Sequence, residues 1–150
     1  MPEYLSEQTS WWCPACRTDV EAKKSLDIHQ TPPYLIISLN RLNQGRDGGK
    51  LDDLISFPLK DFDLRSVMRE SAVALMNERG KTPFYDLCGI VYHYGTLRWG
   101  HYNAACLNSD SETGEWYKYD DSDVSRVSDP NQLVTSSAYV LVYKRKDIAN

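Results

Sequence analysis

The stretch that decides the fold runs from residue 85 to residue 121 and has the sequence YDLCGIVYHYGTLRWGHYNAACLNSDSETGEWYKYDD. Aromatic, β-branched and other apolar residues are concentrated at 85–94, 101–107 and 116–121, and shorter polar or glycine-containing segments separate these runs. Such composition is typical of strands bounded by turn residues. We predict three strands here, the last two joined as a hairpin through the polar loop 108–115.

Further strands are predicted on both sides of this stretch. Residues 137–143 form another apolar run near the C-terminus. Upstream, a pattern that repeats every second residue indicates a strand over 20–28. Its members are Val20, Ala22, Lys24, Leu26 and Ile28. The segment 34–42 is rich in β-branched and aromatic residues, so we expect a second, largely buried strand there.

One amphipathic helix is expected between residues 64 and 76. Its apolar residues recur at spacings of three and four, the period of a helix with one buried face, and Gly80 and Pro83 close it. A single clear helix among five or six strands, without regular alternation of strands and helices, predicts an α+β fold. The sheet should be mainly antiparallel, with one or two helices in the chain.

Composition and charge limit the class of protein. The chain has 150 residues, 41% of them hydrophobic, which is enough for one compact domain. Its formal net charge of −4 at pH 7 gives no overall positive field, so nucleic acid is not an expected partner. No apolar run approaches the roughly 20 residues that span a bilayer, and the first residues lack a secretory signal. We therefore expect no membrane partner and a cytoplasmic or nuclear location, or both.

A histidine and two aspartates form the candidate catalytic site. Gly100 precedes His101, and its missing side chain would allow another backbone or a substrate to approach closely. In the predicted hairpin, pairing His101 with Asp120 or Asp121 places the centre of the turn inside the polar loop. Directly opposed residues hold their Cβ atoms about 4.5–5.5 Å apart, so a carboxylate could accept a hydrogen bond from the imidazole, as in a nucleophilic triad. The alternative is a histidine that merely lies near an acidic turn.

Several segments of the chain are similar to motifs of the ubiquitin-specific proteases, a family of cysteine peptidases. In chain order they are Cys13-Pro14-Ala15-Cys16; Ala22 and Lys24; Pro32; Leu35-Ile36-Ile37-x-Leu39-x-Arg41; Phe57-Pro58; Tyr85-Asp86-Leu87; His93-x-Gly95; Gly100-His101-Tyr102-x-Ala104; Trp116-Tyr117-Lys118-Tyr119-Asp120-Asp121-Ser122-x-Val124; and Ala138-Tyr139-Val140-Leu141-x-Tyr143. The resemblance extends from about Trp12 to about Arg145. It is closest to members whose catalytic domain is split by a long insertion, leaving a C-terminal half that begins at the cysteine pair.

This resemblance implies a fold and a domain organisation. The chain would be the fingers-and-palm half of a papain-like cysteine protease domain. Residues 1–11 would be a lead-in, 12–146 the C-terminal half of the catalytic domain and 147–150 a tail. The expected partners are ubiquitin, ubiquitinated proteins and the N-terminal half of the same catalytic domain.

The resemblance also implies a reaction and roles for three residues. The family hydrolyses the isopeptide or peptide bond after the ubiquitin C-terminus through an acyl-thioester on a cysteine. His101 would be the general base, and Asp120 would orient it. Asp121 would be a neighbouring carboxylate that helps to polarise the site or substitutes for Asp120.

The nucleophilic cysteine of the family, which lies in an Asn-rich box at the start of a helix, has no counterpart in this sequence. Cys106 lies five residues beyond His101, so an alternating strand turns it to the opposite face. Cys88 lies in mid-strand among apolar neighbours, where a thiol is usually a core residue. Cys13 and Cys16 precede a strand, so no helix N-terminus lowers their pKa. We expect the chain alone to be inactive and the nucleophile to come from the other half of the domain.

Cys13 and Cys16 form a C-x-x-C pair that suits a tetrahedral zinc ion. A closed structural site needs four ligands, and the sequence has no second such pair. The resemblance implies that the partner pair lies in the first half of the domain, so these two residues would be half of a zinc site. His29 is disfavoured as a third ligand because its place on the strand suits a side chain facing solvent. A thioredoxin-like redox motif is disfavoured because no helix follows the pair.

Two other functions remain open from the sequence. The chain could be a non-catalytic ubiquitin-binding or scaffold fragment in which the histidine and aspartate are a remnant. It could also be a self-sufficient zinc-knuckle interaction domain. The last hypothesis predicts stoichiometric metal in the purified chain, whereas half a zinc site predicts little or none.

Overall fold

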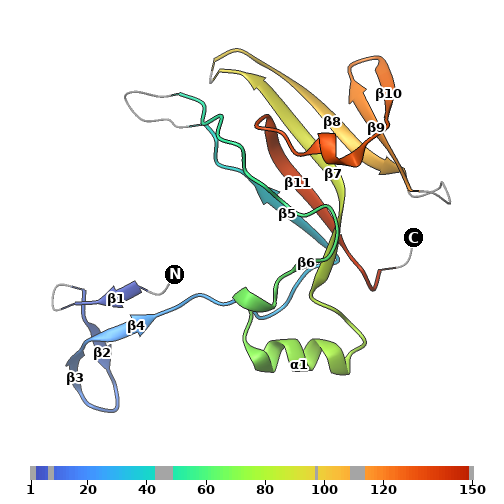
Figure 1. The fold of residues 1–150 in the computed structure, drawn as a ribbon. Helices are drawn as coiled ribbons and strands as arrows, with labels where there is room; N and C mark the ends of the chain where they lie inside the picture. The colour runs from blue at the N-terminus through green and yellow to red at the C-terminus, as the bar shows by residue number, and fades with distance from the viewer. Residues whose placement is uncertain (1–2, 7–8, 43–48, 97, 109–113, 149–150) are drawn as a thin grey trace.

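The structure, a computed structural model, describes residues 3–6, 9–42, 49–96, 98–108 and 114–148. Its main element is a seven-stranded antiparallel sheet in the order β10-β9-β8-β7-β11-β5, with β6 pairing on β7 (Figure 1). The strands are β5 (Tyr34–Ser38), β6 (Phe62–Asp63), β7 (Phe84–Gly95), β8 (Gly100–Asn108), β9 (Glu115–Asp120), β10 (Asp123–Val127) and β11 (Ala138–Arg145). The predicted α+β fold with a mainly antiparallel sheet is confirmed.

The central strands of this sheet are the ones predicted from the sequence. The runs at 85–94, 101–107, 116–121 and 137–143 correspond to β7, β8, β9 and β11. β8 and β9 form the predicted hairpin, and the tip of its turn, residues 109–113, lies outside the described residues. Local composition was sufficient here because each strand has buried residues on at least one face.

Two small sheets form a separate arm at the N-terminal end of the chain (Figure 1). β1 (Glu3–Leu5) pairs with β4 (Ala22–Lys24), and β2 (Trp11–Cys13) pairs with β3 (Thr18–Val20). The prediction of one strand over 20–28 is wrong, since its first part belongs to β3 and its next part to β4. The two parts pair with different strands, so the alternation of residue types does not describe one common face.

The helix begins later than predicted. Residues 65–67 form the 3₁₀ helix η1 (Arg65–Val67), and α1 covers Glu70–Glu78. Between them Met68 is extended, and it pairs with Ile28 in an isolated parallel bridge. Leu64 and Met68 are buried, so their spacing reflected burial in the core rather than membership of one helix. No helix among the described residues is long and apolar enough to cross a membrane.

The two edge strands of the main sheet differ from expectation. The predicted strand at 34–42 is shorter, and it is not largely buried, since Tyr34 is 52% and Ile36 67% exposed. β5 ends the strand order, and only alternate residues of it are partly covered. At the other edge, β10 was not predicted. Its residues are nearly all exposed, so it lacks the apolar pattern by which a strand is recognised.

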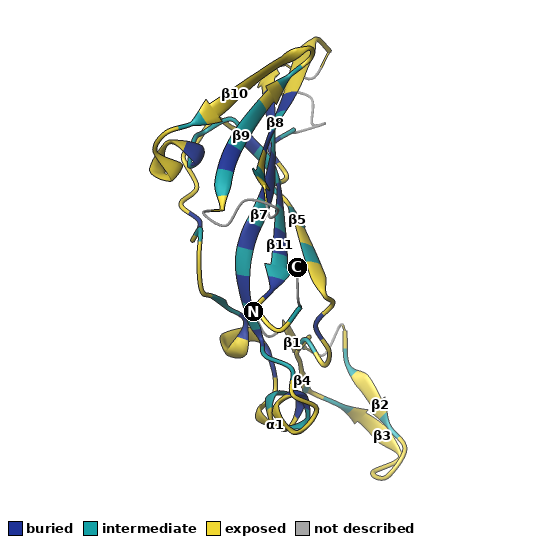
Figure 2. Cartoon of the chain, turned by 90° about the vertical axis from the view of Figure 1, so that its right-hand side faces the viewer, coloured by how far each residue is buried: buried dark blue, intermediate teal, exposed yellow. Residues whose placement is uncertain are grey.

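The core lies between the main sheet and the segments that cross it. Figure 2 shows buried residues along the central strands and exposed residues on the outer surface of α1 and on β10. The covering residues come from the segment 57–76 and from η2 (Pro130–Leu133). The buried hydrophobic residues are Phe57, Leu64, Met68, Ala72, Met76, Tyr85, Leu87, Ile90, Tyr92, Ala105, Trp116, Leu133, Ala138, Leu141 and Tyr143.

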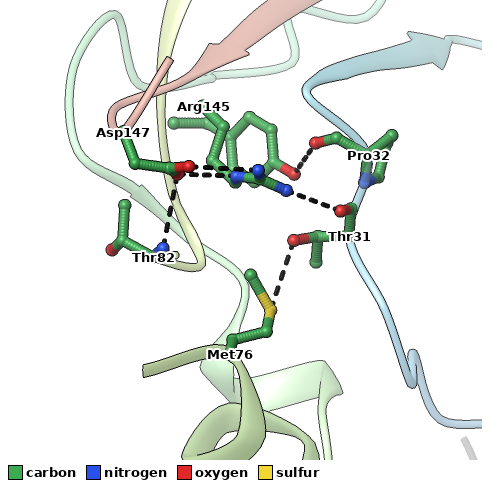
Figure 3. Close-up of polar contacts among 7 residues, drawn as sticks. Thr31, Pro32, Met76, Thr82, Arg145 and Asp147 are labelled. Carbon is green, nitrogen blue, oxygen red and sulfur yellow. Dashed lines mark hydrogen bonds and ion pairs between the residues drawn. The ribbon is translucent and has the colours of Figure 1, made fainter. Parts of the chain in front are cut away.

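A buried arginine joins the end of β11 to the segment before β5 (Figure 3). Arg145, which is 3% exposed, donates to Asp147 at 2.6 and 3.1 Å and to the carbonyl oxygen of Thr31 at 2.7 Å. Asp147 in turn accepts a bond from the backbone N–H of Thr82 at 3.3 Å. The contacts satisfy a charge that would be costly to bury unpaired.

Candidate active site

His101 and Asp120 lie together at one end of the main sheet. His101 is the second residue of β8 and pairs with Tyr94 of β7, and Asp120 is the last residue of β9. Nε2 of His101 lies 2.5 Å from Oδ1 of Asp120. Their side chains are 47% and 38% exposed, so the pair is accessible to a group from outside the sheet.

The two residues are diagonal neighbours rather than directly opposed. The register of β8 and β9 pairs Ala104 with Tyr119, and its continuation by one residue sets Asn103 opposite Asp120. Our prediction of direct opposition was therefore wrong. His101 and Asn103 are two residues apart on one strand and share a face. A long or aromatic side chain can reach a diagonal neighbour, which is how the imidazole meets the carboxylate.

The second oxygen of Asp120 also has a partner. Nδ2 of Asn103 donates to Oδ2 of Asp120 at 2.9 Å, and Nζ of Lys118 lies 3.9 Å from the same oxygen. The hydrogen bond from His101, and then that from Asn103, lower the pKa of Asp120 below its ordinary value. Asp120 is thus ionised at neutral pH, with one oxygen directed to the histidine and the other to the amide.

The contact with Asp120 affects both the pKa of His101 and which ring nitrogen carries the proton. The hydrogen bond to Asp120 raises the pKa of His101, and the charge of Lys118 opposes that shift. Because a carboxylate only accepts hydrogen bonds, the ring proton of neutral His101 lies on Nε2. Nδ1 is then left with a free lone pair, and no hydrogen bond joins it to any residue in the described part of the chain. The imidazole can take up a proton at Nδ1.

Asp121 lies beside this pair in the turn between β9 and β10. Its φ of 51° is in the left-handed region, which aspartate tolerates better than most residues. Its charge contributes to the raised pKa of His101, after the contributions from Asp120. Ligand atoms of His101, Asp120 and Asp121 lie within 4.8 Å of one another. The same atoms could hold a metal ion, but an ion on the imidazole would occupy a nitrogen that acid–base chemistry requires.

Comparison with known proteins assigns the chain to a family. The family model described as ubiquitin carboxyl-terminal hydrolase matches residues 4–143. The chain belongs to the ubiquitin carboxyl-terminal hydrolase family. Ubiquitin carboxyl-terminal hydrolase 15 of Homo sapiens is 38% identical over 146 residues, which are 97% of this chain and 14% of that protein. Ubiquitin carboxyl-terminal hydrolase 4 of Rattus norvegicus is 35% identical over 147 residues, again 97% of this chain and 14% of the relative.

Solved structures of this hydrolase family have the same fold. One is the SAGA DUB module Ubp8/Sgf11/Sus1/Sgf73 bound to monoubiquitin, with a TM-score of 0.78 and 32% identity over 99% of this chain and 31% of that one. Another is the module bound to ubiquitin aldehyde, with a TM-score of 0.77 and 30% identity over 99% of this chain and 32% of that one. The similarity confirms the papain-like half-domain that the resemblance implied. The chain spans under a third of these chains and about a seventh of the two hydrolases above.

Sequence analysis assigned no role to three residues of this chain that lie at the candidate site or pack beside it. Asn103 and Lys118 approach Asp120, as described above. His93 lies on the opposite face of the sheet, is 2% exposed, and has ring centroids 4.6 Å from Tyr102 and 5.7 Å from Tyr139. Burial, and secondarily the charge of Lys50, lower the pKa of His93. On the predicted strands, Asn103 lies two residues from His101 and Lys118 lies two residues from Asp120. This spacing was the only indication in the sequence that they could face the site.

The four cysteines of this chain lie away from His101. Cys106 pairs with Gly89 and Tyr117, and it lies five residues from His101 on β8, roughly 16 Å along the strand. Burial raises the pKa of both Cys88 and Cys106, which opposes thiolate formation. Neither of these thiols is arranged to donate a proton to His101.

Cys13 and Cys16 fit two ligands of one metal ion. They lie at the hairpin of β2 and β3, where the backbone N–H of Arg17 donates to the carbonyl oxygen of Cys13 at 2.8 Å. Hydrogen bonds from the backbone and then the side chain of Cys16 lower the pKa of Cys13. Among the described residues they belong to no group of three or more possible ligands, and His29 is exposed. The pair therefore fits half of a four-ligand site.

Proposed function

We propose that this chain supplies the general base and its orienting carboxylate to a thiol-dependent deubiquitinating hydrolase. His101 is the base and Asp120 orients it. The observation that supports the proposal is the 2.5 Å contact between Nε2 of His101 and Oδ1 of Asp120, in a chain that belongs to the ubiquitin carboxyl-terminal hydrolases. The substrate is a protein or peptide joined to the C-terminus of ubiquitin.

The chemistry follows from the nitrogen that Asp120 leaves free. A cysteine from the part of the catalytic domain outside this chain gives its thiol proton to Nδ1 of His101. The thiolate attacks the carbonyl carbon of the bond after the ubiquitin C-terminus, and the imidazolium returns the proton to the leaving amine. Water, deprotonated by the same imidazole, then cleaves the thioester. Asp120 stabilises the imidazolium, and Asp121 adds a second negative charge nearby.

The cysteine pair has a separate, structural part in this proposal. Cys13 and Cys16 contribute two thiolates to a zinc ion whose other two ligands lie outside the chain. Zinc there would hold the hairpin of β2 and β3 against the rest of the domain, and it takes no part in the hydrolysis. The lowered pKa of Cys13 favours the thiolate that a metal requires.

The test uses the complete protein that contains this chain and a ubiquitin–fluorophore substrate. His101→Gln keeps a polar side chain and removes the base, so we expect kcat to fall by about 10²–10⁴. His29→Gln is the matched control, because His29 is exposed and has no part in the site. Hydrolysis by His101→Gln at the wild-type rate would disprove the assignment. A complete protein that binds ubiquitin but does not cleave the substrate would instead establish the non-catalytic alternative.

A complementation experiment tests the division of the site between two parts. The chain alone should cleave nothing, and addition of the part of the domain that contains the nucleophile should restore cleavage. A folded complex of the two parts that remains inactive would contradict the proposal.

A further inference from the structure

We propose that Asn103 is a positioning residue that aligns Asp120 with His101. This inference rests on the proposed function, since it concerns the same pair. Asn103 lies two residues along β8 from His101 and directly opposite Asp120 in the continued register. It is 6% exposed, and its Nδ2 donates to Oδ2 of Asp120 at 2.9 Å.

The hydrogen bond from Asn103 restricts rotation of the Asp120 carboxylate, which would otherwise weaken the contact with His101. A carboxylate at the end of a strand can rotate and present either oxygen to the imidazole. With Oδ2 bound to a buried amide, only Oδ1 is directed at Nε2 of His101. The imidazole is then held in the tautomer that leaves Nδ1 available. Lys118 approaches the same oxygen, but its 3.9 Å separation is too long for a hydrogen bond.

The side-chain oxygen of Asn103 indicates that this residue is not explained by a contribution to the stability of the fold. Because the carboxylate must face the N–H₂ group, Oδ1 of Asn103 is turned away from Asp120. This oxygen is buried and has no hydrogen-bond partner among the residues that the structure describes. A buried acceptor without a partner destabilises a fold. A leucine of similar shape would bury no such atom, so the amide is explained by its donor to Asp120.

A structural and a positioning role therefore predict opposite results for Asn103→Leu. In the complete protein, we expect kcat to fall about tenfold, because alignment of a catalytic group contributes on this scale. KM for ubiquitin–fluorophore should change less than about twofold, and the thermal midpoint should stay level or rise. Cys106→Ser, on the same strand and the opposite face, is the control and should change neither quantity.

Asn103→Asp provides a second readout that a packing role would not produce. At neutral pH the new carboxylate would repel Asp120 and donate nothing. When protonated it would again donate a hydrogen bond to Oδ2. The activity of Asn103→Asp relative to wild type should therefore rise as the pH falls from about 8 to about 6. The titratable and charged groups near position 103 are Tyr92 and Tyr94 on β7, His101 on β8, Lys118 and Asp120 on β9, and Asp121 in the following turn.

The outcomes separate this inference from the function on which it rests. Full activity of Asn103→Leu, or a parallel loss of activity and thermal stability, would overturn the positioning role. An activity ratio for Asn103→Asp that does not depend on pH would also overturn it. If His101→Gln is active as well, the proposed function itself fails. If His101→Gln is inactive and Asn103→Leu is fully active, only the role of Asn103 is wrong.

Discussion

The imidazole of His93 fills the space that a side chain at Gly100 would need. A Cβ atom on Gly100 would lie 2.2 Å from Nε2 of His93 and 2.9 Å from the carbonyl oxygen of Tyr94. Gly100 directly precedes His101 and pairs with Gly95, whose φ is 108°. The close approach expected from the glycine therefore occurs, but the nearest group is a side chain from the far face of the sheet. His101 directly follows this closely packed position on β8, so a shift of Gly100 would also move the backbone of His101.

Gly100→Ala should displace His101 and lower kcat at least about tenfold, since a misplacement of about 1 Å at a catalytic group can cost 10²-fold. Overpacking should also lower the free energy of unfolding by about 1–3 kcal/mol. Both quantities can be measured in the complete protein, by ubiquitin–fluorophore kinetics and by urea denaturation.

Gly89→Ala is the control for this variant. A Cβ atom on Gly89 would meet Val142 at 3.5 Å, an ordinary contact, so activity should be unchanged. The double variant His93→Ala with Gly100→Ala should recover part of the lost activity, because the larger of the two collisions is removed. No recovery, with both single variants folded, would show that the imidazole does not limit position 100.

The pH dependence of hydrolysis should depend on Asp120. A general base acts in its unprotonated form, so kcat/KM should rise as the pH increases through the pKa of His101. The hydrogen bond that His101 donates to Asp120 raises this pKa. Asp120→Asn removes the carboxylate charge, so the acid limb of the profile should move to lower pH while the maximal rate falls. Asp19→Asn, at an exposed residue of β3, should leave the profile in place, and an unmoved limb in Asp120→Asn would contradict the pairing.

Zinc analysis tests the role of the hairpin of β2 and β3. The complete protein should bind one zinc ion through Cys13 and Cys16, and Cys16→Ser should lose most of it. Cys106→Ser should keep the metal, because Cys106 lies on the main sheet. Elemental analysis of the isolated chain should find little zinc. A stoichiometric ion in the isolated chain would favour a self-sufficient zinc-knuckle domain.

The buried ion pair at the end of β11 should stabilise the fold. Asp147→Asn would leave the guanidinium of Arg145 buried without a counter-charge and should cost roughly 3–5 kcal/mol in urea denaturation. The ordinary pKa of Asp147, 3.8, is lowered first by the Arg145 hydrogen bond. The contribution of Asp147 to the free energy of unfolding is therefore complete above its ordinary pKa. It is lost as the pH falls through the depressed pKa of the folded state.

An exposed ion pair next to it provides the comparison for Asp147→Asn. Lys146 pairs with Asp61, and their side chains are 41% and 66% exposed. Asp61→Asn should cost less than about 1 kcal/mol, because water screens the pair. Equal costs for the two variants would mean that burial does not distinguish the pairs.

The candidate site could be predicted only in part. The residue types and their order along two adjacent strands were enough to select His101 and Asp120 as a possible pair. Their diagonal relation depends on the register of β8 and β9, which a turn of uncertain length does not specify. Asn103 could not be assigned a role for the same reason, because only the register sets it opposite Asp120.

Sequence by itself determined which segments of this protein are strands of the main sheet and which histidine follows a glycine, since these properties depend on side chains that are neighbours along the chain. Tertiary structure decided the break of the segment 20–28, the late start of α1, the packing of His93 under Gly100 and the hydrogen bond from Asn103 to Asp120. Each of these depends on a partner from another element, and the free energy of such a contact is set by register and burial. Neither quantity can be read from local composition.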